Sequence, residues 1–310
     1  RPFRRGLSST LPRARSRSIG TTSSITPAST ATCGYVAAPQ VHVEDVTITT
    51  DIDGGDGIVT WSVLSHNADL LATRVTIFDD EGNVVAEETG ANARTRIPSV
   101  HLWQPGQGYL YEAEISLVNG DEVIDAYRQA FGVRTIRVDG TCLLINGEPV
   151  YLTGFGMHED HQTIGKAHND ALMLRDAACL EWVGANSLRT SHYPYSEHIL
   201  DYADRHGLLV IDETPAVGMN MGLGGGIFGT QGYTTFSAET INDETQKVHA
   251  QVIRDLIDRD KNHPSIIIWS IANEPESETE AAENYFRPLF DVAHEADPSR
   301  PVSFVNVMLA

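Results

Sequence analysis

The sequence predicts a protein of β plus α/β type with more than one domain, in which an all-β domain precedes an α/β domain. Three observations carry this prediction. The chain has 310 residues, which is the length of about two domains. Short runs of alternating β-branched residues occupy residues 41–138. After residue 140, apolar strands and helical stretches alternate, which is typical of proteins with a parallel sheet.

The composition excludes several classes of function. The chain has 42 acidic and 22 basic side chains, and its formal net charge is −20. A nucleic-acid-binding protein needs a basic surface that displaces counterions from phosphates, so we expect no nucleic-acid partner. No apolar run reaches the roughly 18 residues that a membrane helix needs, so we expect no membrane partner.

The cysteines and histidines give no sign of a metal or a disulfide framework. Cys33, Cys142 and Cys179 are odd in number, far apart and without CxxC spacing. The histidines show no HExxH spacing. We therefore predict reduced thiols, a cytoplasmic location, and a reaction that needs neither a metal nor another cofactor.

Residues 1–34 differ from the rest of the chain. They contain six arginines and no acidic residue, and they have neither helical nor strand periodicity. Their composition is that of a transit peptide or of a disordered tail. A one-base shift of the reading frame over residues 21–34 can instead give a string that contains FFNYAGIHR. We hypothesise that this segment is an out-of-frame translation of the end of a preceding domain, which the DNA sequence tests.

Residues 35–139 are predicted to form an immunoglobulin-like β-sandwich, because about seven short strands follow one another at regular spacing. Asn119-Gly120 favours a hairpin turn. The aromatic segment HLWQPGQGYLYE (101–112) could be a ligand platform, but we expect it to pack in the core or against the next domain. The strand-like runs are VTITTDI (46–52), IVTWSVLS (58–65), RVTIFDD (74–80), NVVAEET (83–89), GYLYEAEISLV (108–118) and VIDAYRQAFGVRTIRV (123–138).

Residues 140–310 begin with the hairpin CLLINGEPVYLTG (142–154) and then alternate between strands and helices. Such alternation predicts parallel strands, in either an open doubly wound sheet or most of a TIM barrel. The glycines of residues 222–226 suggest a flexible active-site loop rather than a phosphate cradle. The expected strands are 150–156, 186–192, 208–213, 265–274 and 302–307, and the expected helices are near 168–183, 195–206, 241–261 and 281–296.

Polar side chains follow four of these strands where each strand ends. In a TIM barrel, the carboxyl ends of the strands form the catalytic face. A core built for stability alone would not place polar clusters at four matching ends. The clusters are His158, Glu159 and Asp160; Thr190, Ser191, His192 and Tyr193; Asp212 and Glu213; and Asn273 and Glu274.

Glu274 is the sharpest candidate for chemistry. It ends the apolar run IIIWSIAN (266–273), and burial would keep its carboxyl group protonated near neutrality. A carboxylic acid that donates a proton is what the cleavage of a glycosidic bond requires. The alternative is a glutamate that caps a following helix, with Pro275 at its first position.

Two long segments resemble the signatures of glycoside hydrolase family 2. They are NSLRTSHYPYSEHILDYADRHGLLVI (186–211) and DKNHPSIIIWSIANE (260–274). The segments GFGMHED (154–160), VIDETPAVG (210–218) and VNVM (305–308) look more like β-glucuronidases than β-galactosidases or β-mannosidases. The shifted string FFNYAGIHR resembles the end of the sugar-binding domain of bacterial β-glucuronidases.

The resemblance implies a fold, in which a sugar-binding jelly roll, an immunoglobulin-like sandwich and a TIM barrel follow one another. Residues 1–34 would be a remnant of the first domain, 35–139 the sandwich, and 140–310 the N-terminal part of a truncated (β/α)8 barrel. The parent protein is then expected to be a bacterial, cytoplasmic homo-oligomer that hydrolyses β-D-glucuronides with retention.

The resemblance also implies the roles of individual residues. Glu274 would be the general acid/base, and Asn273 would hold the sugar 2-hydroxyl. His192 and His158 would line the sugar subsite, and Met308 the aglycone side. The supporting residues would be Arg189, Tyr193 and Asp160.

The nucleophile and the residues that read the glucuronate carboxylate would lie beyond Ala310, so we expect this chain to be an inactive fragment of limited solubility. The alternatives are a β-galactosidase or β-mannosidase of the same family, and a non-catalytic carbohydrate-binding protein. Hydrolysis that depends on Glu274 would favour an enzyme. Sugar binding without hydrolysis that the substitution Glu274→Gln leaves unchanged would favour the binding protein.

Overall fold

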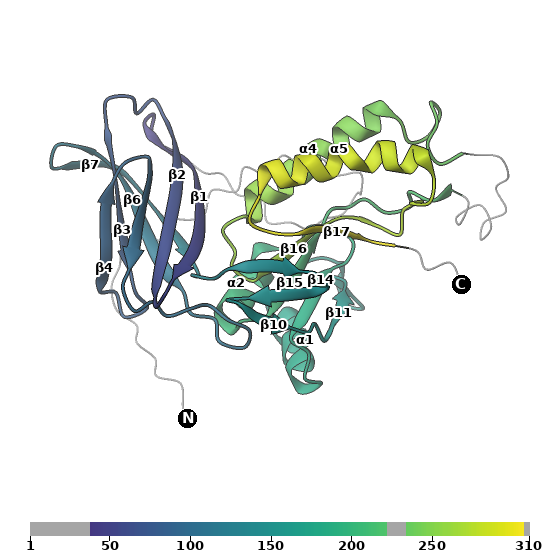
Figure 1. Ribbon diagram of the computed structural model, residues 1–310, viewed down its shortest axis with the longest axis horizontal. Coiled ribbons are helices and arrows are strands. Elements are labelled where there is room, and N and C mark those ends of the chain that lie inside the picture. Colours follow the sequence, from purple (N-terminus) through teal and green to yellow (C-terminus); the bar gives the residue numbers. More distant parts are fainter. Residues whose placement is uncertain (1–37, 222–233, 307–310) are drawn as a thin grey trace.

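The computed structural model describes residues 38–221 and 234–306, and it has an immunoglobulin-like sandwich followed by part of a TIM barrel (Figure 1). The segment 1–34, the glycines of 222–226, Met308 and Cys33 lie outside the described residues. The described Cys142 and Cys179 are both free. None of the described helices is both long and apolar enough to cross a membrane.

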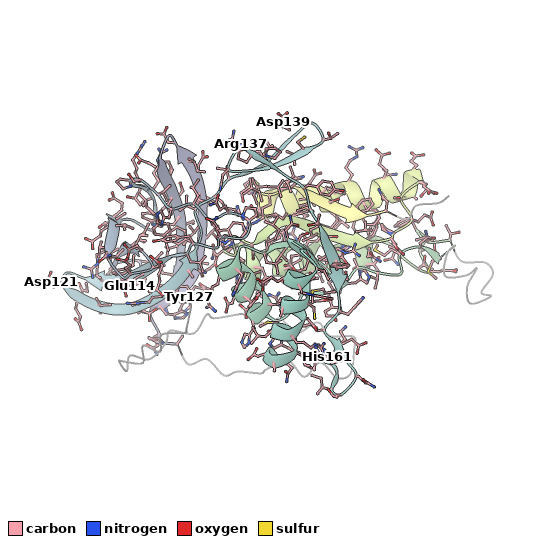
Figure 2. The ribbon with its side chains drawn as sticks, turned by 90° about the horizontal axis from the view of Figure 1, so that it is seen from below. Glu114, Asp121, Tyr127, Arg137, Asp139 and His161 are labelled. Atoms are coloured by element: carbon pink, nitrogen blue, oxygen red, sulfur yellow. The ribbon has the colours of Figure 1, made fainter. Side chains whose placement is uncertain are left out.

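The sandwich consists of two antiparallel sheets, with strand orders β1-β2-β5 and β4-β3-β6-β7. Alternate residues of each strand point inward, so that Trp61, Ile77, Ile115 and Leu117 meet in one apolar core. Asp121 lies at the tip of the β6–β7 hairpin in Figure 2. The strands are β1 (His42–Asp53), β2 (Asp56–His66), β3 (Ala72–Phe78), β4 (Val84–Thr89), β5 (Asn92–Ile97), β6 (Tyr111–Asn119) and β7 (Glu122–Phe131).

The joint between the two domains is a small antiparallel sheet, β10-β9-β8, together with the aromatic segment 101–112. Trp103 is completely buried, and its indole N–H donates to the carbonyl oxygen of Asp204 at 2.7 Å. Arg134 donates to the carbonyl oxygens of Pro264 and Ile266, at 2.6 and 3.0 Å. The expected packing role of the aromatic segment is thereby confirmed. The strands of this sheet are β8 (Ile136–Asp139), β9 (Cys142–Ile145) and β10 (Glu148–Val150).

The parallel sheet has the strand order β11-β14-β15-β16-β17, in which the large strands are neighbours in the order of the chain. A doubly wound sheet would reverse its strand order, whereas a barrel does not. The consecutive strand order therefore favours part of a TIM barrel over an open doubly wound sheet, the two alternatives that the sequence left open. The strands are β11 (Gly154–Met157), β14 (Ser187–Thr190), β15 (Leu209–Glu213), β16 (Ile266–Asn273) and β17 (Val302–Val305), and a separate hairpin is formed by β12 (Asp160–His161) and β13 (Gly165–Lys166).

The four described helices follow strands of this sheet, and α4 and α5 lie side by side next to β16 and β17 (Figure 1). Ser196 caps the start of α2, and Gly207 ends it in the left-handed conformation, as its sequence predicts. Helix α5 begins at Glu280 after the N-cap Thr279, so the alternative that Glu274 and Pro275 open a helix is wrong. The helices are α1 (Asp170–Trp182), α2 (Glu197–His206), α4 (Asp243–Asp260) and α5 (Glu280–Ala296).

Candidate active site

The candidate site lies at the carboxyl ends of neighbouring parallel strands. Strand register places Glu213 of β15 opposite Ser270 of β16, and Asn273 of β16 opposite Val305 of β17. The structure therefore brings the polar residues that end β14, β15 and β16 to one edge of the sheet. In a barrel, this edge is the one that carries catalysis.

Glu274 follows the last residue of β16 and has a positive φ of 49°. A residue other than glycine rarely adopts this conformation, and such residues concentrate at functional sites. Its amide N–H donates to the carbonyl oxygen of Val305 at 2.7 Å, which fixes the turn. The side chain is exposed, so the expectation that Glu274 is buried is wrong. The apolar run stops at Asn273, and the backbone turns at the next residue.

Asn273 is buried beside it, with 8% of its surface exposed. Its backbone N–H donates to the carbonyl oxygen of Ala216 at 2.9 Å. Its side-chain Oδ1 is buried and accepts no hydrogen bond from the described residues. An unpaired buried acceptor costs free energy, and a hydroxyl group of a bound molecule would satisfy this oxygen. The amide is thus suited to hold a ligand next to the Glu274 carboxylate.

His192 is held by Glu213, a residue whose role the sequence did not reveal. Glu213 is completely buried, and its Oε1 lies 2.6 Å from Nδ1 of His192. Its Oε2 accepts a hydrogen bond from Ser270 Oγ at 2.8 Å, and Arg189 Nη1 lies 3.6 Å from the same oxygen. Because both oxygens are engaged inside the protein, Glu213 is a positioning residue and is not free to attack a substrate. The only signal in the sequence was its place at the end of β15.

Thr190 and Asp212 hold the backbone of Glu213 in place through a chain of hydrogen bonds. Thr190 Oγ1 donates to Asp212 Oδ1 at 2.8 Å and accepts from the Glu213 amide at 2.8 Å. Burial, together with the nearby Asp260 carboxylate, raises the pKa of Asp212 to about 8. Burial therefore favours the neutral, protonated form of Asp212 over the carboxylate.

His158 and Tyr193 extend the site toward β11. The ring centroid of His158 lies 5.4 Å from that of His192 and 6.3 Å from that of Tyr193. The Tyr193 hydroxyl accepts from the Glu159 amide at 2.9 Å, and Nζ of Lys166 lies 3.6 Å from the centre of its ring. These contacts give the site one aromatic and imidazole wall.

The remaining predicted residues are Arg189, Asp160 and Met308. Arg189 lies inside the cluster, where its Nε donates to Ser191 Oγ at 3.1 Å. Asp160 is exposed in β12, and among the residues in 38–221 and 234–306 its carboxylate makes no hydrogen bond. Met308 lies outside the described residues, so its predicted role on the aglycone side stays a prediction.

The comparisons with known proteins agree with this order of domains. Residues 41–134 match the domain described as "Glycosyl hydrolases family 2", and residues 136–310 match "Glycosyl hydrolases family 2, TIM barrel domain". A β-glucuronidase from Paenibacillus borealis is 40% identical over 267 residues, which cover 86% of this chain and 44% of that protein. A β-glucuronidase from Sus scrofa is 37% identical over 276 residues, which cover 86% of this chain and 40% of that protein.

A solved β-glucuronidase from Ruminococcus gnavus has a TM-score of 0.81 and 40% identity, covering 86% of this chain and 44% of that one. Another structure of the R. gnavus enzyme holds a C6-substituted uronic isofagomine, with a TM-score of 0.78 and 38% identity, covering 86% of this chain and 43% of that one. The chain thus spans less than half of the length of the relatives it matches.

Proposed function

Because the chain belongs to family 2 of the glycosyl hydrolases, we propose that it carries the acid/base side of a retaining site for β-D-glucuronides. The observation that carries the proposal is the pairing of Glu274 and Asn273: an exposed carboxylate held at positive φ stands next to a buried amide oxygen that has no partner among the described residues. The related proteins named as β-glucuronidases support the choice of substrate.

In this proposal, Glu274 works twice. Its carboxylic acid first donates a proton to the glycosidic oxygen, while the bond from this oxygen to the anomeric carbon breaks. The resulting carboxylate then takes a proton from the water that attacks the glycosyl intermediate, which restores the acid. An exposed position suits this double role, because water must reach the same carboxylate in the second step.

The other predicted residues would bind and orient the sugar. Asn273 would accept a hydrogen bond from the 2-hydroxyl, a contact that strengthens in the transition state of glycosidases. His192 and His158 would line the sugar subsite, with His192 fixed by Glu213. A retaining reaction also needs a nucleophilic carboxylate about 5 to 5.5 Å from the acid, and we assign this role to no described residue. We therefore propose that the 310-residue chain alone has no turnover.

A chimera tests the role of Glu274. Residues 41–310 replace the matching segment of the R. gnavus enzyme, and hydrolysis of phenyl β-D-glucuronide is measured. We expect activity in the chimera, and a loss of roughly 10²–10⁴-fold in kcat for Glu274→Gln. The loss in kcat/KM, which reports the bond-breaking step, should be much smaller for 2,4-dinitrophenyl β-D-glucuronide, since this leaving group departs without protonation.

The control is Glu278→Gln, an exposed glutamate four residues away that should leave the rate unchanged. Equal activity of the Glu274→Gln chimera and the parent chimera on the phenyl substrate would exclude Glu274 as the acid. For the chain alone, hydrolysis that Glu274→Gln abolishes would contradict the proposed absence of turnover. Sugar binding that ignores this substitution would favour a non-catalytic carbohydrate-binding protein.

A further inference from the structure

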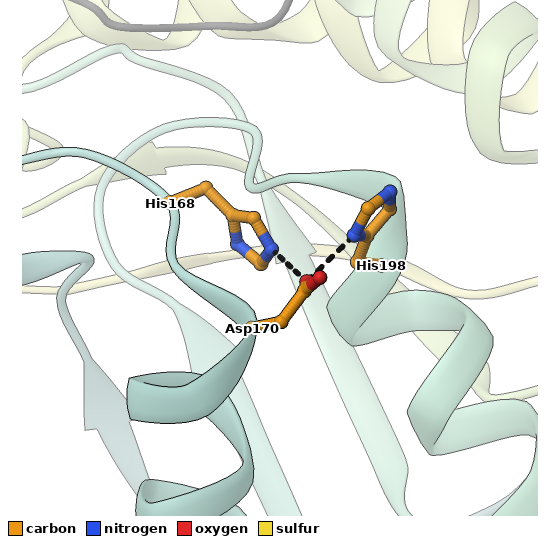
Figure 3. Close-up of side chains that lie close together, drawn as sticks. All are labelled: His168, Asp170 and His198. Carbon is orange, nitrogen blue, oxygen red and sulfur yellow. Dashed lines mark hydrogen bonds and ion pairs between the residues drawn. The ribbon is translucent and has the colours of Figure 1, made fainter.

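We propose that His168, Asp170 and His198 form a binding site for a divalent first-row metal ion, best suited to zinc (Figure 3). The three residues each offer one ligand atom, and these atoms lie within 4.8 Å of one another. The site joins the segment that follows the β12–β13 hairpin to the first turn of α2. The proposal does not depend on the proposed hydrolase activity.

The two imidazoles converge on one carboxylate oxygen. Oδ1 of Asp170 lies 2.7 Å from Nε2 of His168 and 2.7 Å from Nδ1 of His198. The two rings are nearly perpendicular, with their centroids 5.0 Å apart. In a tetrahedral zinc site with bonds of about 2.1 Å, neighbouring donors lie about 3.4 Å apart. Small side-chain rotations would therefore open enough space for the ion.

A second carboxylate orients His168 from its other side. Nδ1 of His168 lies 3.1 Å from Oε1 of Glu159, and both side chains are mostly buried. A histidine that ligates a metal through one nitrogen usually donates the N–H of its other nitrogen to a carboxylate, which fixes the tautomer and the ring. His168 has this arrangement already, and its Nε2 faces the proposed metal position.

Capped helix ends hold the donors in place. Asn169, between His168 and Asp170, caps α1 by accepting a hydrogen bond from the Leu172 amide at 3.1 Å. Ser196 caps α2 two residues before His198. The side chains of Asp170 and His198 are exposed, so that an ion can enter and water can complete the coordination.

The donor set selects the kind of metal. Two imidazoles and one carboxylate suit zinc and its neighbours in the first transition row. Calcium and magnesium prefer sites made only of oxygen ligands. No sequence motif indicates this site, because the ligands stand two and 28 residues apart and only the fold brings them together.

A bound metal ion would connect the segment around Glu159, which lies beside the proposed sugar site, to helix α2. Glu159, which orients His168, also donates its amide N–H to the Tyr193 hydroxyl at 2.9 Å. A bound ion would thereby stiffen the segment that carries His158. The alternative is a hydrogen-bonded cluster of two histidines and an aspartate that binds no metal.

Zinc titration of the 310-residue chain, after removal of metals with EDTA, tests the site by competition with a chromophoric chelator. We expect one zinc ion per chain at a site that His198→Gln weakens at least tenfold. Glu159→Gln should weaken it by roughly 10–100-fold, as other outer-shell substitutions do. The control His294→Gln, an exposed histidine on α5, should change nothing. Zinc should also raise the Tm of the parent chain and not that of His198→Gln.

The absence of saturable zinc binding would overturn the proposal. Zinc binding with the same affinity in the parent chain, His198→Gln and Asp170→Asn would overturn it as well, since the ion would then sit elsewhere. Asp170→Asn keeps the shape of the side chain, so it decides the question if His198→Gln does not fold. Cobalt in place of zinc should give visible absorption bands in the parent chain that both variants lose.

Discussion

His263 and Asp204 form an ion pair at the end of the barrel that faces the sandwich. Nδ1 of His263 lies 2.6 Å from Oδ2 of Asp204, and the other carboxylate oxygen accepts from the Ser265 amide at 3.0 Å. Burial by itself lowers the pKa of His263, but the carboxylates of Asp204, Asp260 and Asp201 together outweigh burial and raise the pKa to about 9. The folded protein therefore binds a proton that the unfolded chain releases near pH 6.5.

This pair predicts a stability that depends on pH. The contribution of His263 is fully present below pH ~6.5 and is lost as the pH rises through about 9. The total amounts to about 3 kcal/mol at most. Urea unfolding between pH 6 and pH 9.5 should show this decline, and His263→Gln should remove it. Asp212 also loses a proton in this range, and it stays in both proteins, so their difference isolates His263. Equal slopes for the two proteins would contradict the prediction.

At the residue scale, the sequence revealed what a side chain is and where its strand ends, but not which way the chain turns there. Glu274 was found because it follows an unbroken apolar strand, yet its exposure depends on a positive φ that no pattern encodes. Glu213 was seen as a polar strand end, but its partners His192 and Ser270 come from two other strands. The proposed metal site has no sequence signal for the same reason, because His198 lies 28 residues from Asp170.

The end of α2 meets the aromatic segment 101–112, which belongs to the sandwich domain. Gly207 ends this helix at φ 68°, and its carbonyl oxygen accepts from the Gly106 amide at 2.9 Å. A Cβ atom on Gly207 would stand 2.5 Å from the Gln104 carbonyl oxygen. The glycine is thus required twice, by the left-handed conformation and by the close approach of the backbone of residues 104–107.

This double requirement predicts a large effect for Gly207→Ala. Gly184 offers a matched comparison, because it has a φ of 75° and nothing within 4 Å of an added Cβ. Gly184→Ala should cost about 1 kcal/mol in the free energy of unfolding, from the left-handed conformation alone. Gly207→Ala should cost roughly 2–4 kcal/mol, since the backbone of the joint must also shift. Urea unfolding of the two variants measures the difference, and equal losses would refute it.

At the element scale, a clear pattern of apolar residues is sufficient to predict a helix or strand, and an element without such a pattern is missed. The four described helices and the five described parallel strands were expected within a few residues of where they lie. Helices α2, α4 and α5 each bury an apolar face, whereas α1 buries Ala177 and Leu180 alone. Strand β5, NARTRI (92–97), was missed among the expected runs, since it lies at a sheet edge with mostly polar side chains. Its pairing with β2 supplies an order that its own residues do not signal.

On the scale of the whole molecule, the parallel sheet ends at β11 and β17, beside which no further strand lies within the described part of the chain. Large apolar side chains are exposed just before β11 and at the end of α1: Tyr151 is 84% and Trp182 is 86% exposed. The segment that follows α1 is joined to the first of these, because the Asn186 side chain donates to the carbonyl oxygen of Tyr151 at 2.8 Å. Unpaired strand edges and exposed apolar side chains both favour association.

We therefore expect the 310-residue chain to associate with itself through this surface. Sedimentation velocity should show particles that grow with protein concentration, and the double substitution Tyr151→Lys with Trp182→Lys should reduce this growth by removing apolar area and adding charge. Leu70→Lys is the control: Leu70 is 97% exposed, but it lies in a turn of the sandwich, far along the chain from β11. If Leu70→Lys reduces association as much as the double substitution does, net charge rather than the β11 surface governs association. A monomeric parent chain at every concentration would show that the sheet edge is protected in solution.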